Sequence, residues 1–152
     1  RIRPLFPLLV RSLDLADPPG RAAAVRTVTL AAAWGKREKE EGVMRARGED
    51  VNDGVVGVGL DLVEEYVGTL LERVGGMLDP GAENTPTVRI AALKCLATLA
   101  RTVPHISIHS HANRVLRALA TRSRGIDDPK RQVRVEAVDA REAFFVLSAQ
   151  KG

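Results

Sequence analysis

The sequence predicts an all-α protein built from repeated pairs of helices. Two segments, residues 87–96 and 132–141, have the same pattern about 45 residues apart, and each has a Val-Arg pair near its start. Superimposing them places Val88 on Val133 and Leu99 on Phe144, so the apolar residues recur at intervals that form one helical stripe. The period matches that of a HEAT-type helical repeat. We therefore expect an α-solenoid.

The two copies define the framework positions of the repeat, which we expect to pack between helices. They are Val88, Arg89, Ala92 and Cys95 in one copy, and Val133, Arg134, Ala137, Ala140 and Phe144 in the other.

A third, weaker copy is expected upstream. Residues 24–33 hold a Val25-Arg26 pair followed by small residues, but this pair precedes Val88-Arg89 by more than one period. Residues 36–53 are mostly charged, have few apolar side chains and nearly account for the surplus, so we expect a solvated loop insertion there. The prediction is one domain, residues 1–152, with three antiparallel helix pairs: repeat 1 over 1–35, the charged insert 36–53, repeat 2 over 54–103 and repeat 3 over 104–149.

Prolines, glycines and capping residues bound the expected helices. Those of the first two repeats are 2–15, 21–34, 60–78 and 87–102. In the first helix the predicted inward residues are Leu5, Leu8, Leu9 and Leu13. In the third they are Leu62, Val63, Tyr66, Leu70, Val74 and Met77. Thr85-Pro86 provides an N-cap followed by a proline that needs no amide donor.

The third repeat is expected to contain a helix over 110–123, with Val115, Leu116 and Leu119 inward. Gly125 ends it, and Asp128-Pro129 starts the last helix by the same cap chemistry.

Composition narrows the functional class. The chain has one cysteine, so it can form neither an intrachain disulfide nor a four-cysteine cluster, and this usage favours a reducing compartment, the cytoplasm or the nucleus. No apolar run approaches the roughly 18 residues of a membrane span. Because the chain begins at Arg1 in an apolar helical pattern, we expect a fragment of a longer protein. No enzymatic activity and no cofactor are predicted.

Three runs carry a resemblance to a known family. They are residues 87–96, 115–120 and 127–145, the last of which includes the block Lys-Arg-Gln-Val-Arg-Val-Glu-Ala-Val-Asp-Ala-Arg. These runs resemble the C-terminal HEAT repeats of the scaffold subunit of the cytosolic iron-sulfur protein assembly targeting complex. That family is named for methyl methanesulfonate sensitivity and is linked to nucleotide excision repair and transcription. The resemblance is good over 87–147, weaker over 2–33 and absent over 36–53. The sequence differs at Phe144-Phe145, where the family more often has Trp-Phe, and in the histidine-bearing linker 104–111.

The resemblance implies a non-enzymatic adaptor. In that family the C-terminal repeats hold a WD-repeat propeller and a small cysteine-bearing subunit, while the full scaffold brings apo iron-sulfur enzymes of DNA replication, repair and transcription to the assembly machinery. The family pattern supplies no catalytic residue, and the matching positions carry over only as repeat framework.

Basic residues suggest where a partner could dock. The chain has a net charge of +4 and a pI near 9.7. We expect an acidic protein surface to contact this region because arginine gives forked hydrogen bonds to carboxylates, although such charges are often only solvated surface. The candidate docking residues are Arg114, Arg117, Arg122, Arg124, Lys130 and Arg131.

Other chemistry is less well supported. His105, His109 and His111 lie close together but lack a carboxylate or thiol at ligand spacing. Gly54, Gly57 and Gly59 have the wrong order for a dinucleotide fingerprint. Cys95 falls on the apolar stripe, as a core thiol does.

Two other functions stay open. One is a HEAT-repeat nucleic-acid or chromatin binder, although aromatics for base stacking make up only 3% of the chain. The other is a structural cap of another helical scaffold.

Overall fold

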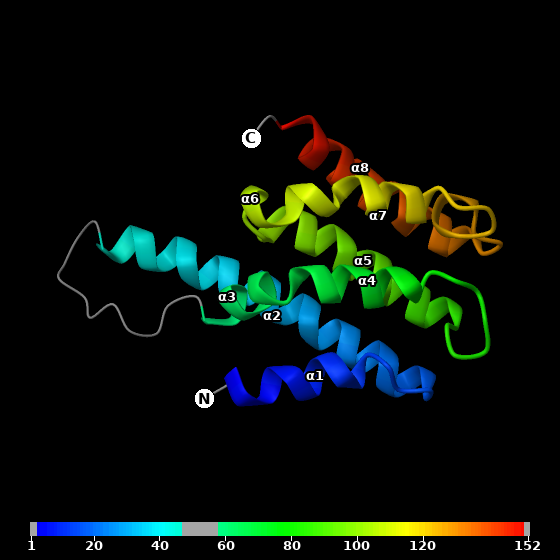
Figure 1. Ribbon diagram of the computed structural model, residues 1–152, viewed down its shortest axis with the longest axis horizontal. Helices are drawn as coiled ribbons and strands as arrows, with labels where there is room; N and C mark the ends of the chain where they lie inside the picture. Colours follow the sequence, from blue (N-terminus) through cyan, green and yellow to red (C-terminus); the bar gives the residue numbers. More distant parts are fainter. Residues whose placement is uncertain (1–2, 47–57, 151–152) are drawn as a thin grey trace.

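The computed structural model describes residues 3–46 and 58–150, and these residues form helices and their connections without any strand (Figure 1). The predicted all-α class is therefore confirmed for the described part of the chain. The helices lie in two layers.

The first pair begins with a 3₁₀ turn, η1 (Arg3–Leu5), followed by α1 (Phe6–Ser12) and α2 (Pro18–Ala46). The predicted inward face of α1 is wrong in part, because Leu5 and Leu8 are more than half exposed while Phe6 and Val10 are buried beside Leu13. The segment is apolar on most sides, so two stripes at helical spacing fit it equally well. The ring of Phe6 contacts that of Tyr66 at a centroid distance of 5.2 Å, and this larger group decides the face.

The predicted loop over residues 36–53 is wrong as far as Ala46, because α2 continues to that residue. Its sequence here is rich in Lys, Arg and Glu, which are good helix formers. Ion pairs one turn apart support it, from Lys36 to Glu40 at 3.9 Å and from Arg37 to Glu41 at 3.8 Å. A low content of apolar residues therefore predicts exposure here, not the absence of a helix. Residues 47–53 of the expected insert lie outside the described residues.

In the second pair, the consecutive helices α3 (Val58–Glu65) and α4 (Val67–Gly76) form one member and α5 (Pro86–Thr102) forms the other. The expected single helix over 60–78 is interrupted at Tyr66, where φ is −100° and ψ is 9°. The expected cap at α5 is present, because the side chain of Thr85 accepts a hydrogen bond from the Val88 amide at 3.5 Å. A close approach joins this pair to α2: a Cβ added to Gly35 would lie 2.5 Å from the Leu60 nitrogen, so the contact needs glycine.

In the third pair, α8 (Arg131–Ala149) packs against a segment made of α6 (His105–Ile108), η2 (His109–His111) and α7 (Ala112–Leu119). The short helix η3 (Gly125–Asp127) lies in the connection between α7 and α8. The helix expected over 110–123 ends earlier, at Leu119, and the chain turns through Gly125 with φ of +55°. The last helix begins at Arg131, with Lys130 at the N-cap position, and not at Asp128-Pro129. The carboxylate of Asp128 accepts a hydrogen bond from the Lys130 amide, just before α8, and it also contacts Arg89.

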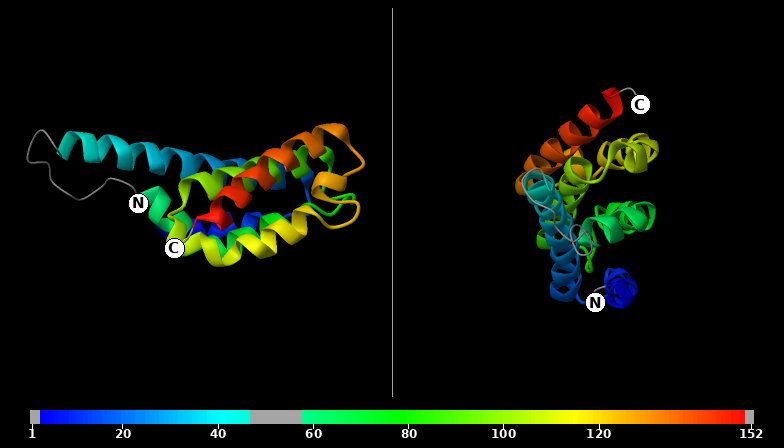
Figure 2. Two further views of the ribbon diagram at one scale, coloured as in Figure 1. Left: turned by 90° about the horizontal axis from the view of Figure 1, so that it is seen from above. Right: turned by 90° about the vertical axis from the view of Figure 1, so that its left-hand side faces the viewer.

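The layers explain how the pairs stack. Helices α2, α5 and α8 form one layer, in which α2 packs on α5 and α5 packs on α8, while α1, α3–α4 and α6–α7 form the other (Figure 2). The three helices of the first layer run in the same direction, and the connections that precede them lie together at one side, which we call the loop edge: residues 13–17, 77–85 and 120–130 (Figure 1). Stacked helix pairs of this kind bury each pair against its neighbours.

Candidate docking surface

Three arginines occupy equivalent places at the loop edge. Arg21, Arg89 and Arg134 are each the fourth residue of their helix, in α2, α5 and α8. Each donates a hydrogen bond back to a main-chain oxygen of the connection that precedes its own helix, over 2.6 to 2.7 Å. The accepting oxygens are those of Leu15, Asn84 and Asp128, respectively. We call these three residues the arginine ladder.

Arg89 also reaches the connection of the next pair. Its Nε donates to Asp128 Oδ2 at 2.8 Å and its Nη2 donates to Oδ1 at 3.1 Å. Arg89 is 4% exposed and Asp128 is 1% exposed. The Lys130 amide donates to Asp128 Oδ1 as well, at 2.8 Å. A buried forked pair with further hydrogen bonds compensates the desolvation of both charges.

Arg21 makes the corresponding contact one pair earlier, with different groups. Its Nη1 donates to Asn84 Oδ1 at 2.8 Å and its Nη2 donates to Glu83 Oε2 at 3.4 Å. The side chain of Glu83 is 60% exposed, so this contact is half-solvated. Both arginines thus join successive helix pairs through their connections.

The ladder corrects the register of the first repeat copy. The sequence comparison aligned Arg26 with Arg89, but Arg26 is exposed on α2 and Arg21 makes the equivalent contacts. The Val25-Arg26 dipeptide of α2 therefore does not occupy the place of Val88-Arg89 in α5. Counting from the proline that starts each helix, Pro18 or Pro86, would have found the correct residue, since the arginine is the fourth helical residue in both.

The framework residues of the two clear copies lie in the interior. All are buried except Arg134, which is half-buried. Cys95 is fully buried, and burial raises the pKa of its thiol to about 11, although a hydrogen bond with Thr29 acts in the opposite direction. At neutral pH the thiol is therefore protonated and inaccessible.

The six predicted docking residues are distributed over α7, the connection that follows it and the start of α8. Arg114 and Arg117 are exposed on α7, in the layer opposite α8. Arg122, Lys130 and Arg131 are exposed around the connection between α7 and α8. Arg124 is ion-paired with Asp79 at 3.1 Å, which ties the second and third connections of the loop edge together.

The outer face of α2, α5 and α8 holds hollows that sequence reasoning missed. One of about 340 Å³ lies between α2 and α5 and is lined by Arg26, Leu30 and Ile90 among others. A second, of about 410 Å³, lies between α5 and α8 and shares Ile90 and Lys94 with the first. Apolar residues stay exposed on these helices, among them Leu30 at 68% and Val135 at 60%, and the sequence alone does not show this exposure.

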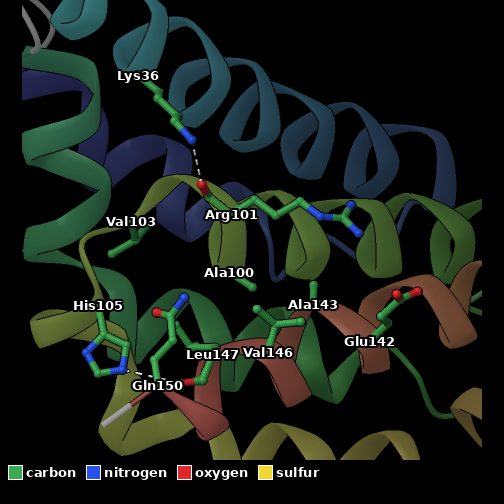
Figure 3. A pocket seen from close by; sticks show the side chains of 10 residues that line it. All are labelled: Lys36, Ala100, Arg101, Val103, His105, Glu142, Ala143, Val146, Leu147 and Gln150. Carbon is green, nitrogen blue, oxygen red and sulfur yellow. Dashed lines mark hydrogen bonds between the residues drawn. The ribbon is translucent and has the colours of Figure 1, made fainter. Parts of the chain in front are cut away.

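A third hollow, of about 590 Å³, lies where the carboxyl-terminal ends of α5 and α8 meet α2 (Figure 3). Lys36 crosses its rim and donates to the main-chain oxygen of Arg101 at 3.0 Å. The guanidinium of Arg101 forms a forked pair with Asp139, over 2.7 and 3.0 Å, which raises the pKa of Arg101 and lowers that of Asp139. The second and third hollows are lined by both basic and acidic residues, whereas the charged residues of the first, Arg26 and Lys94, are basic.

The histidines lie at the junction of α6 and η2. A nitrogen of His105 is 3.3 Å from the Leu147 oxygen, and the His105 and His109 rings are 4.6 Å apart at their centroids. Within residues 3–46 and 58–150, no group of three His, Cys, Asp or Glu side chains is placed to hold a metal ion. Gly54 and Gly57 of the glycine-rich segment lie outside the described residues.

No described helix is both long enough and apolar enough to cross a membrane.

Comparison with known proteins identifies relatives, although no protein-family model matches the chain. The chain is 28% identical over 146 residues to the DNA repair/transcription protein MMS19 of Saccharomyces cerevisiae, which covers 96% of the chain and 12% of that protein. It is 36% identical over 86 residues to the DNA repair/transcription protein mms19 of Schizosaccharomyces pombe and 38% identical over 84 residues to the human MMS19 nucleotide excision repair protein homolog. Each of those alignments covers 8% of the relative and just over half of the chain. The resemblance inferred from the sequence is thereby confirmed: this chain is similar to a short stretch of the MMS19 proteins.

Proposed function

We propose that the chain is the C-terminal part of a HEAT-type α-solenoid and acts as a non-enzymatic docking module of the cytosolic iron-sulfur assembly targeting complex. In this role it helps to deliver iron-sulfur clusters to apo-proteins of DNA replication, repair and transcription, in the cytoplasm and the nucleus. Its proposed direct partners are the WD-repeat propeller and the small cysteine-bearing subunit. Client enzymes are engaged through the full-length scaffold.

The observation that carries the proposal is the similarity to an MMS19 protein along nearly the whole chain. The geometry supports it in a second way. Helices α2, α5 and α8 present one continuous outer face with open hollows, and a solenoid uses such a surface to hold other proteins.

The experiment is capture of the two purified subunits by the immobilised chain. We expect binding to the wild-type chain, and weaker binding after the double reversal Lys130→Glu and Arg131→Glu. These residues are exposed at the start of α8, where acidic residues interact well with the helix dipole, so the fold is expected to persist.

A duplex-DNA binding assay at two salt concentrations runs beside it. Salt-sensitive DNA binding that is lost in the double variant, with subunit capture unchanged, would favour a nucleic-acid function instead. A chain that binds none of these molecules would be a structural cap.

A further inference from the structure

Helices α5 and α8 are copies of one pattern, and within residues 3–46 and 58–150 a further helix pair is stacked on the following side of α5 but not on that of α8. In α5 the residues on that side begin at Arg89 and continue through Leu93 and Leu96 to Ala100, because residues three and four apart share a helix face. Leu93 and Leu96 are fully buried. At one end of this stripe Arg89 contacts Asp128, and at the other end Ala100 lines the hollow between α5 and α8.

The same positions on α8 are exposed. The equivalents of Arg89, Leu93, Leu96 and Ala100 form what we call the end face: Arg134, Val138, Arg141 and Phe145. Val138 is 57% exposed and Phe145 is 47% exposed. The guanidinium of Arg141 lies over the Phe145 ring, 4.9 Å from its centroid. The end face is therefore apolar at its centre and positively charged.

Arg134 has the position of Arg89, but its two hydrogen bonds both come from one nitrogen. Its Nη1 donates to the main-chain oxygens of Asp128 at 2.7 Å and Pro129 at 3.1 Å. In Arg89 the other two nitrogens, Nε and Nη2, bind the carboxylate of Asp128. Within the described part of the chain, Nε and Nη2 of Arg134 have no hydrogen-bond partner. The fork that recognises a carboxylate in α5 is thus present in α8.

We propose that the end face docks an acidic segment of a partner subunit. The segment presents a carboxylate to Nε and Nη2 of Arg134, as Asp128 does to Arg89, and lays apolar side chains on Val138 and Phe145. This inference rests on the proposed function and specifies the chemistry of its partner. Charge complementarity favours this occupant over a second copy of the chain, because symmetric self-pairing would bring Arg134 and Arg141 of each copy against the same charges.

The test uses the same capture of the propeller and the small cysteine-bearing subunit. We expect Arg134→Gln to weaken capture roughly tenfold or more, since a forked, partly desolvated charge contact is lost. Arg134→Lys keeps the charge but loses the fork, and is expected to recover capture only in part. Val138→Asp is expected to abolish it. The thermal midpoint of each variant is measured first by circular dichroism.

Matched controls lie away from the end face. Arg11→Gln removes an exposed arginine of α1, in the other layer, and Ile106→Asp places a charge at an apolar residue of α6 that is 89% exposed. Both are expected to leave capture unchanged. Wild-type capture that Arg134→Gln and Val138→Asp do not reduce, in folded variants, overturns the end-face proposal alone. No capture by the wild-type chain overturns the proposed function and this occupant together.

Discussion

Arg21 and Arg89 hold the same place in successive helix pairs, yet they bind different groups in different surroundings. Arg89 donates two hydrogen bonds to the carboxylate of Asp128, and both Arg89 and Asp128 are nearly inaccessible to water. Arg21 binds the amide oxygen of Asn84 and the half-solvated carboxylate of Glu83. A buried charge must keep its partner, whereas a solvated one can exchange it for water. The junction of the second and third pairs therefore depends on one ion pair far more than the junction of the first and second pairs does.

Removing the buried carboxylate of Asp128 is expected to have the largest effect on stability. We expect Asp128→Ala to lower the free energy of unfolding by about 3–5 kcal/mol, because it leaves the guanidinium of Arg89 buried without a counter-ion. Urea unfolding followed by circular dichroism measures it. Glu142→Ala, which removes an exposed acid of α8, is the control and should change stability by less than about 0.5 kcal/mol. A normal unfolding midpoint for Asp128→Ala would contradict the burial described here.

Replacing both partners separates the cost of an orphaned charge from the value of the pair. The double variant Arg89→Met with Asp128→Leu has no charge left to desolvate, so we expect its stability to lie within about 2 kcal/mol of the wild type and above that of either single variant. The four unfolding free energies form a double-mutant cycle. Additive losses would mean that the two side chains are not coupled.

Removing the half-solvated contacts of Arg21 is expected to lower the free energy of unfolding by a smaller amount. We expect Arg21→Ala to cost about 1–2 kcal/mol, since its hydrogen bonds to Leu15 and Asn84 are replaced in part by bonds to water. The ion pair with Glu83 adds little because that carboxylate is exposed. The same urea titration applies. If Arg21→Ala were as damaging as Asp128→Ala, the two junctions would not differ as we describe.

The exposed pair of Arg101 and Asp139 gives the smallest effect, and it depends on pH. Each side chain is about half exposed, so we expect Asp139→Asn to cost less than about 1 kcal/mol at pH 7. Arg101 holds the pKa of Asp139 below its usual value. The stabilisation is therefore complete above the unfolded-state pKa of about 3.9 and is lost as the pH falls through the lower folded-state pKa. Thermal midpoints of wild type and variant are expected to converge at low pH; a constant gap would exclude this cause.

The sequence predicts the fold best where a strict pattern repeats. The stripe from Val133 to Phe144 has helical spacing and a second copy to compare with, and its residues are buried. The pattern is less informative where η1 meets α1, because Leu5 and Phe6 are both apolar and only packing on Tyr66 decides which one is buried. In α2 the charged segment after Trp34 has too few apolar residues to predict a buried face, but its residue types favour helix.

The docking surface could be predicted only in part. Arg89 and Arg134 stand out as repeat residues, but nothing local in the sequence joins Arg89 to Asp128, 39 residues away. The basic residues of α7 and the following connection were grouped by position along the chain. The structure places Arg114 and Arg117 on α7 and Arg131 on α8, which lie in different layers, and it gives Arg124 a partner in Asp79. Proximity in sequence is a poor guide to a common surface when a turn lies between the residues.

The arginine ladder also has a mechanical consequence. Its rungs join the pairs at the loop edge, where the Arg89 bonds are shielded from water. At the opposite end of α5 the contacts are solvent-exposed: Lys36 with the Arg101 oxygen, and Arg101 with Asp139. Exposed charges are screened by salt, and buried ones much less. We therefore expect the stack of helix pairs to be stiff along the loop edge and more easily deformed along the opposite edge. Rising ionic strength should then change the curvature of the stack, because it weakens the contacts on the side away from the arginine ladder.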